Sequence, residues 1–245
     1  MQAGLAGPGD RPVSRRWLVL GAKPEPILPP SGAFDALACA NASGYSAARL
    51  GLPIPAFTVL TALLTDGSAA GRLRIESLRG LATRTVHYYP QRLRGRTVLA
   101  RAWARARAWR TTPLMLRRAL AGVGYRFEHF TTRTTEEYRR LLVALCQGDP
   151  AVVAQLERKQ ASSGVLAVAL ALAEPDVERV IVSGFSFELT QAAGEDPNIL
   201  RRGTAASKHA ATDTLVLGTL ARHHPALVTT EPIVHAAAGV PLLSP

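Results

Sequence analysis

Trp17-Leu-Val-Leu-Gly21 is an apolar run that ends in a glycine, and it indicates a buried parallel strand followed by a turn. Two similar runs come next, Phe34-Asp-Ala-Leu-Ala-Cys-Ala40 and Ala56-Phe-Thr-Val-Leu60. Between them, residues 45–50 suit a short helix that Gly51 would end. Strands and helices that alternate at this close spacing predict a parallel sheet with crossover helices.

The same alternation returns in the last third of the chain. Ser162-Ser-Gly164 opens a helix that extends through Ala173, and Val177 to Val182 is a strand. Another helix, strand and short helix are expected at 209–223, 226–229 and 233–238. We therefore predict an α/β fold, with a single Rossmann-like parallel sheet and flanking helices.

The net charge of +11 is concentrated in the middle of the chain. Residues 77–127 hold twelve arginines and no acidic residue, whereas the rest of the chain holds 17 basic and 18 acidic residues. The arginines are at positions 79, 84, 92, 94, 96, 101, 105, 107, 110, 117, 118 and 126. This distribution indicates a near-neutral enzyme body with a basic arm, and not a uniformly basic nucleic-acid binder.

Composition bounds the remaining possibilities. A chain of 245 residues that is 47% hydrophobic can bury a sizeable core, which excludes wholesale disorder. The longest apolar run, residues 165–173, is about half of the roughly 18 residues that a membrane span needs. Cys39 and Cys146 define neither a disulfide framework nor a zinc site, so we expect a cytoplasmic protein.

The chain is expected to form one domain that follows a flexible N-terminal segment. Residues 1–16 are rich in Gly, Pro and Arg, and they are predicted to be a flexible N-terminus. Residues 17–245 form the α/β domain, interrupted by a basic helical insertion at about 77–130 that would serve as a lid or acceptor region. Within it we expect a strand at 84–89 and helices at 97–110 and 114–121.

Ligands of open parallel sheets bind beyond the carboxyl ends of the strands, so the residues after each predicted strand are the candidate pocket. These segments are 21–24, 41–43, 183–186 and 229–231. The residues that we expect to bind a ligand there are Gly21, Ala22, Pro24, Asn41, Ser43, Gly184, Phe185 and Ser186. No P-loop and no GxGxxG motif is present, so neither an ATPase nor a dinucleotide enzyme is supported.

Two further groups could bind an anion. Ser162, Ser163 and Gly164 begin a helix, whose free N–H groups and dipole favour phosphate, although ordinary helix capping explains the same residues. Arg201 and Arg202 suit phosphate or carboxylate, although a solvated loop is an equal alternative.

His209 is the most suggestive titratable residue. Asp213 follows it by one helical turn, and a carboxylate at that spacing could orient the imidazole as a general base requires. The alternative is a surface histidine in a helix-turn ion pair. The clustered carboxylates of a divalent-metal site are absent from the sequence, so no metal is predicted.

The basic arm carries Trp103, Trp109 and several leucines among its arginines. This combination is typical of an interfacial element attracted to anionic lipid, so a peripheral membrane contact through residues 91–118 is predicted. An RNA-binding surface and a plain solvated helix are the alternatives, and nucleic acid is the less favoured partner.

In order and spacing, three blocks resemble the bacterial lipo-oligosaccharide sialyltransferase family, a metal-independent inverting group that uses CMP-activated sugars. The first block is 18–24 with 34–41, which is similar to the family's opening strand and to its strand that ends in Cys-Asn. The second, 162–172 with 177–187, is similar to the Ser-Gly helix and the next strand end. The third, His209 to Asp213, resembles the helix start that supplies the catalytic base. Together they cover about half of the chain.

The resemblance implies a function for several of these residues. Asn41 would contact the nucleotide or the sugar, the Ser162–Gly164 turn would hold the CMP, and His209 would deprotonate the acceptor hydroxyl. The family's tyrosines that steady the departing phosphate have no counterpart in residues 188–208, where Arg201, Arg202 or Lys208 could replace them. Ser186 stands where the family often has Asp, so sialic acid and Kdo both stay open as the donor sugar.

The resemblance implies a glycosyltransferase that moves an acidic sugar from a CMP-activated donor to a cell-surface glycan or glycolipid precursor. The reaction would invert the anomeric configuration and need no cofactor beyond the donor substrate. The enzyme is expected in the cytoplasm, at the inner face of the cell membrane. The alternative is a non-catalytic binding or scaffold protein of the same fold, with a basic arm for anionic lipid or RNA.

Overall fold

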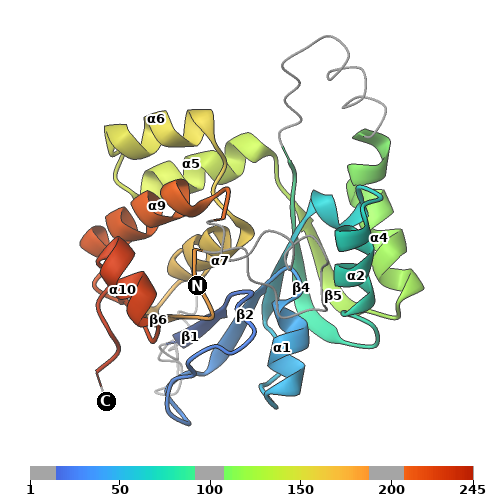
Figure 1. Ribbon diagram of the computed structural model, residues 1–245, viewed down its shortest axis with the longest axis horizontal. Coiled ribbons are helices and arrows are strands. Elements are labelled where there is room, and N and C mark those ends of the chain that lie inside the picture. Colours follow the sequence, from blue (N-terminus) through green and yellow to red (C-terminus); the bar gives the residue numbers. More distant parts are fainter. Residues whose placement is uncertain (1–14, 92–107, 188–206, 245) are drawn as a thin grey trace, which may run out of the picture.

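A seven-stranded parallel sheet forms the centre of the protein, in the strand order β5-β4-β3-β2-β1-β6-β7 (Figure 1). The computed structural model describes residues 15–91, 108–187 and 207–244. The strands are β1 (Arg15–Leu20), β2 (Ala36–Ala40), β3 (Phe57–Thr61), β4 (Ala82–Tyr89), β5 (Arg126–Thr132), β6 (Val177–Ser183) and β7 (Leu227–Thr229). Every pair of neighbouring strands is parallel, so the predicted α/β fold with one parallel sheet is confirmed.

Helices cover both faces of this sheet (Figure 1). On one face lie α1 (Ser43–Arg49), α2 (Ala69–Glu76) and α4 (Pro113–Gly122), with the short 3-10 helices η1 (Ala62–Thr65) and η2 (Trp109–Thr111). On the other lie α5 (Thr135–Leu145), α6 (Pro150–Arg158), α7 (Ser163–Leu172), α9 (Ala210–His223) and α10 (Pro232–Ala238). The side chains of β1 alternate between the two layers: Trp17 and Val19 pack on the α7 side, and Leu18 and Leu20 on the α1 side.

The central helix α7 explains the longest apolar run in the sequence. All ten of its residues are buried, because it packs against β1, β2, β3 and β6 and is covered in turn by α5 and α9. A helix that is apolar on every side is buried on every side. Its N-terminus is therefore fixed firmly at the carboxyl edge of the sheet.

The order of the strands creates a switch point at β1. The chain passes from β1 outward to β5, then returns to the opposite side of β1 with β6 and β7. The chain leaves β1 toward β2 and leaves β6 toward β7, on opposite sides, and the carboxyl ends at such a switch point are where open parallel sheets bind ligands.

Part of the predicted basic insertion belongs to the sheet. Residues 77–130 contain β4, η2, α4 and most of β5, and no strand was predicted between Pro90 and Val177. The strand β5 lacks an apolar run because it is an edge strand whose residues are exposed or half-buried. The expected helix at 97–110 falls mostly outside the described residues. The flexible N-terminus does too, except that Arg15 and Arg16 already belong to β1.

Two helices, α2 and α6, were not predicted. The helix α6 follows a recognisable N-terminal signal, since Asp149 caps it by accepting from the amides of Ala151 and Val152, and Pro150 occupies its first position. Half of the residues of α2 are exposed, and its only buried residues are Gly71 and Ile75, so no apolar stripe indicates it.

Candidate functional site

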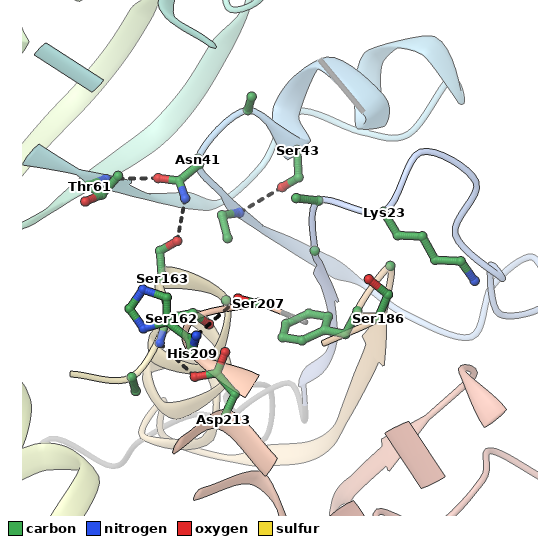
Figure 2. Close-up of a pocket in the computed structure, with 18 of the residues that line it drawn as sticks. Lys23, Asn41, Ser43, Thr61, Ser162, Ser163, Ser186, Ser207, His209 and Asp213 are labelled. Atoms are coloured by element: carbon green, nitrogen blue, oxygen red, sulfur yellow. Dashed lines mark hydrogen bonds between the residues drawn. The ribbon is translucent and has the colours of Figure 1, made fainter. Parts of the chain in front are cut away.

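A pocket of about 260 Å³ opens at the carboxyl ends of the central strands (Figure 2). It brings together twelve of the residues predicted from the sequence: Gly21, Ala22, Asn41, Ser43, Ser162, Ser163, Gly164, Gly184, Phe185, Ser186, His209 and Asp213. Pro24 is not among the lining residues, because the chain turns away after Lys23, whose amide donates to the Gly184 carbonyl. Arg201 and Arg202 lie outside the described residues.

Two glycines allow the walls of the pocket to approach one another. A Cβ on Gly21 would lie 2.3 Å from the carbonyl oxygen of Gly184, so the loops after β1 and β6 could not pass this closely with any other residue. A Cβ on Gly164 would lie 2.8 Å from the ring of Phe185. The ring thus packs directly on the first turn of α7.

Asn41 connects three elements at the floor of the pocket (Figure 2). Its Nδ2 donates to Ser163 Oγ at 2.6 Å, and its Oδ1 accepts from the Thr61 amide at 3.0 Å. The backbone is left-handed here, with a φ of 51°, which asparagine tolerates better than most residues. Asn41 therefore fixes the end of β2 to the end of β3 and the start of α7.

The serines of the pocket have different roles. Ser43 is fully buried, and its Oγ accepts from the Ala40 amide and donates to the Leu20 carbonyl, so it stabilises the loop behind the pocket. Ser162 Oγ caps α7 by accepting from the Val165 amide. Within the described part of the chain, the amides of Ser163 and Gly164 have no hydrogen-bond acceptor. They are the free donors of this helix N-terminus.

His209 lines the same pocket from the position just before α9. Its Nδ1 lies 2.9 Å from the carbonyl oxygen of Gln160, which can only accept, so Nδ1 carries the hydrogen and Nε2 has the free lone pair. Burial lowers the pKa of His209, and the charges of Lys208 and Lys159 lower it further. The imidazole is accordingly neutral at neutral pH, as a proton acceptor must be.

Asp213 does not orient the imidazole, which corrects the expectation from its helical spacing. Its Oδ1 accepts from the Ser162 amide at 2.8 Å, while the Gln160 carbonyl is the partner of His209. Burial raises the pKa of Asp213 to about 7. The carboxyl group therefore joins the start of α9 to the start of α7, and it positions the Ser162–Gly164 turn.

The charges at the pocket are mostly positive. Lys208 and Arg74 both line it, and burial together with the charges of Lys159 and Arg74 lowers the pKa of Lys208. Lys23, by contrast, is turned away from Asn41 and Ser163 in Figure 2, because its Nζ binds the buried carboxylate of Glu231 at 2.7 Å.

Sequence reasoning placed Glu231 after a strand but assigned it no role. Its Oε1 accepts from the amides of Ile27 and Gly184, both at 2.9 Å, and its side chain is fully buried. The carboxylate thereby ties the loops after β1 and β6 to the end of β7. Thr61, Gln91 and Arg74 were also missed. Thr61 ends β3 and Gln91 lies just after β4, so the strand-end rule applied to those strands would have found both.

The described residues contain neither a cluster of metal-binding side chains nor a helix that could span a membrane. No group of three or more His, Cys, Asp or Glu side chains is arranged there to hold a metal ion. None of the helices in that part of the chain combines the length and the hydrophobicity that a membrane span requires.

Comparison with known proteins gives a remote likeness. No protein-family model matches the chain, and no curated protein matches it. The sialyltransferase CstII from Campylobacter jejuni, solved with the substrate analogue CMP-3FNeuAc, is similar at a TM-score of 0.49 and 14% identity, over 94% of this chain and 86% of that one. CstII with cytidine-5'-monophosphate is similar at a TM-score of 0.42 and 13% identity, over 94% and 85%. Below a TM-score of 0.5, nothing about the activity of this chain follows from the likeness.

Proposed function

We propose that this protein is a glycosyltransferase that takes an acidic sugar, of the sialic acid or Kdo type, from a CMP-activated donor. The observation that carries the proposal is one pocket in which a neutral histidine faces a helix N-terminus with free amides. Helix N-termini bind phosphate through such amides, and a neutral imidazole can accept a proton. The motifs of the sequence that resemble the lipo-oligosaccharide sialyltransferase family fall in this same pocket.

In the proposed donor complex, the amides of Ser163 and Gly164 bind the phosphate of CMP. Asn41 holds the turn in place through Ser163 Oγ, and it borders the nucleotide or the sugar. Lys208 lies beside His209 and provides a positive charge for the departing phosphate. In the family, tyrosines steady this phosphate, and Lys208 would replace them here. The positive charges of Lys208 and Arg74 at the pocket favour a donor with two negative charges.

In the proposed reaction, Nε2 of His209 accepts the proton of an acceptor hydroxyl. The hydroxyl oxygen attacks the anomeric carbon as the bond to the CMP phosphate breaks, and the bonding electrons leave with CMP. A single displacement of this kind inverts the configuration at that carbon. The acceptor would be a cell-surface glycan or glycolipid precursor, as the family resemblance implies.

The test is the release of CMP from CMP-sialic acid and from CMP-Kdo, with and without glycan acceptors. His209→Asn should lower the rate by about 10²–10⁴-fold while CMP binding is retained, because the base is lost and the phosphate site is not. His235→Asn is the matched control, since the Nδ1 of His235 also bonds a backbone carbonyl, that of Val240 at 2.9 Å, far from the pocket. An unchanged rate in His209→Asn would overturn the proposal.

The dependence of the rate on pH gives a second measure of the same residue. Because burial lowers the pKa of His209 below its ordinary 6.5, the base stays deprotonated down to mildly acidic pH. The rate should therefore decline only as the pH falls below 6.5. An acid limb with its midpoint above 7 would contradict the assigned base.

A further inference from the structure

The surface formed by η2 and the exposed side of α4 combines bare apolar side chains with arginines. Trp109 and Leu114 are 57% and 56% exposed, and among the large apolar side chains of the described residues only Ile54 is more exposed. Arg110, Arg117 and Arg118 surround them and are exposed as well. We call these five residues the Trp109 surface.

The fold holds this surface outward. Leu116 and Leu120 anchor the opposite side of α4 and are fully buried. The Thr111 carbonyl accepts a hydrogen bond from the buried Tyr88 hydroxyl, which fixes η2 to the sheet. Since residues 114, 117 and 118 share one helical face, Leu114 projects from the same side as its two arginines. The exposure of Trp109 and Leu114 is thus built into the packing.

The charge of this region is unbalanced. The Arg110 guanidinium lies 5.2 Å above the Trp109 ring, and its end reaches Gly67, whose carbonyl accepts from Arg72 at 2.6 Å. Arg117 lies 5.2 Å above the Phe130 ring. Residues 77–127 contain no acidic residue, and of the two acids that flank this range Glu76 is already paired with Arg79 while Glu128 lies in β5. The patch therefore carries a net positive charge beside its apolar side chains.

We propose that the Trp109 surface docks on an anionic lipid bilayer. Arginines attract the negative headgroups, while tryptophan and leucine enter the boundary between headgroups and acyl chains. Nucleic acid is the less suitable occupant, because an exposed leucine beside the arginines gains nothing from a phosphate backbone. This contact is independent of the pocket chemistry, and it concerns where the protein acts.

The position of the surface also fits an acceptor held in a membrane. η2 contacts η1, which follows β3, and Thr61 and Leu63 at this strand end line the pocket. Trp109 and Leu114 therefore lie at the same carboxyl edge of the sheet as the pocket. A bilayer on the Trp109 surface would bring its headgroups to the side where the pocket opens.

The test is flotation of the whole protein with vesicles of phosphatidylcholine, alone or with 30% phosphatidylglycerol. The protein should float only with the anionic vesicles, and the floated fraction should fall severalfold when NaCl is raised from 0.1 to 0.5 M. The double variants Trp109→Ser/Leu114→Ser and Arg117→Gln/Arg118→Gln should each lower the floated fraction at least fivefold. Circular dichroism should show that both fold.

The matched control is Arg49→Gln/Ile54→Ser. Arg49 and Ile54 are also exposed, Ile54 at 64%, but they lie at the opposite, amino-terminal edge of the sheet. This variant should float like the unmodified protein. If the floated fraction fell equally in all three variants, or if the unmodified protein did not float with anionic vesicles, the proposal would be overturned.

Fluorescence gives a signal from the surface itself. In a Trp103→Phe background, anionic vesicles should shift the tryptophan emission to the blue, and Trp109→Phe should remove the shift, since the remaining Trp17 is buried and would not respond. If the protein instead binds a mixed RNA tightly, ignores vesicles and loses RNA binding only when the arginines are replaced, the surface is a nucleic-acid site and the lipid proposal is wrong.

Discussion

Asp213 shows how a side chain expected in one role acts in another. Spacing along the helix suggested that it would orient His209, but its Oδ1 binds the Ser162 amide, and a backbone carbonyl orients the histidine instead. Sequence periodicity can place two side chains on one face of a helix, but it cannot reveal that a distant loop supplies a better partner. Gln160 is 49 residues away from His209, and nothing in its own type indicates the contact.

The pH dependence of stability tests the environment of Asp213. Burial raises its pKa in the folded protein from 3.8 to about 7, so the folded state holds the proton more tightly than the unfolded state does. Stability from this residue is present below pH 4 and is lost as the pH rises through 7, on the order of a few kcal/mol. In Asp213→Asn nothing ionises, so the melting temperature of the variant relative to the original protein should rise between pH 4.5 and pH 8. A constant difference would contradict a buried Asp213.

Glu231 is the second residue with a measurable consequence. Glu231→Gln removes the negative charge that pairs with the Lys23 ammonium and places an NH₂ donor against either Lys23 or the amides of Ile27 and Gly184, so it should cost about 3 kcal/mol in urea unfolding. Asp35→Asn is the matched control, because its pair with Arg16 is on the surface and should cost under about 1 kcal/mol. Equal costs for the two variants would show that the buried carboxylate does not hold the loops.

At the scale of elements, α7 is the part of the fold that joins stability to the site. Gly164→Ala places a methyl group against the Phe185 ring in a packed wall, which should cost about 1–3 kcal/mol and weaken CMP binding. Gly122→Ala is the matched control, since a Cβ there meets no atom within 4 Å, and the replacement should be neutral or stabilise α4 by up to about 1 kcal/mol. Urea unfolding and CMP titration of both variants would test this difference. Equal stability and equal CMP affinity of the two variants would contradict the close contact between Gly164 and Phe185.

The elements differed in how well the sequence predicted them. The buried strands β1, β2, β3 and β6 are apolar and short, and α7 is apolar throughout, so these elements were predicted within a few residues. The edge strand β5 was missed because it is half-exposed and carries Arg126 and Glu128. Many of the residues that line the pocket were predicted because the central strands were predicted. In an open parallel sheet the ligand binds beyond the carboxyl ends of the strands, so correct strands are enough to locate these residues.

At the scale of the whole molecule, the distribution of the charged residues along the chain is more informative than the net charge of +11. The near-neutral remainder of the chain carries five of the seven described strands and most of the pocket, while the arginines gather between residues 77 and 127, partly on β4 and partly on the Trp109 surface. The switch point at β1 is what assembles segments from five strand ends and two helix starts into one pocket. No local pattern predicts how Glu231, from the last tenth of the chain, locks the loop that follows the first strand.

The most direct test of the central claim is a calorimetric titration of the whole protein with CMP. We predict one CMP bound per chain, with the affinity lowered at least tenfold in Gly164→Ala and unchanged in Gly122→Ala and His209→Asn, because α7 holds the phosphate and His209 acts on the acceptor. No binding of CMP, or binding that Gly164→Ala leaves intact, would contradict the account.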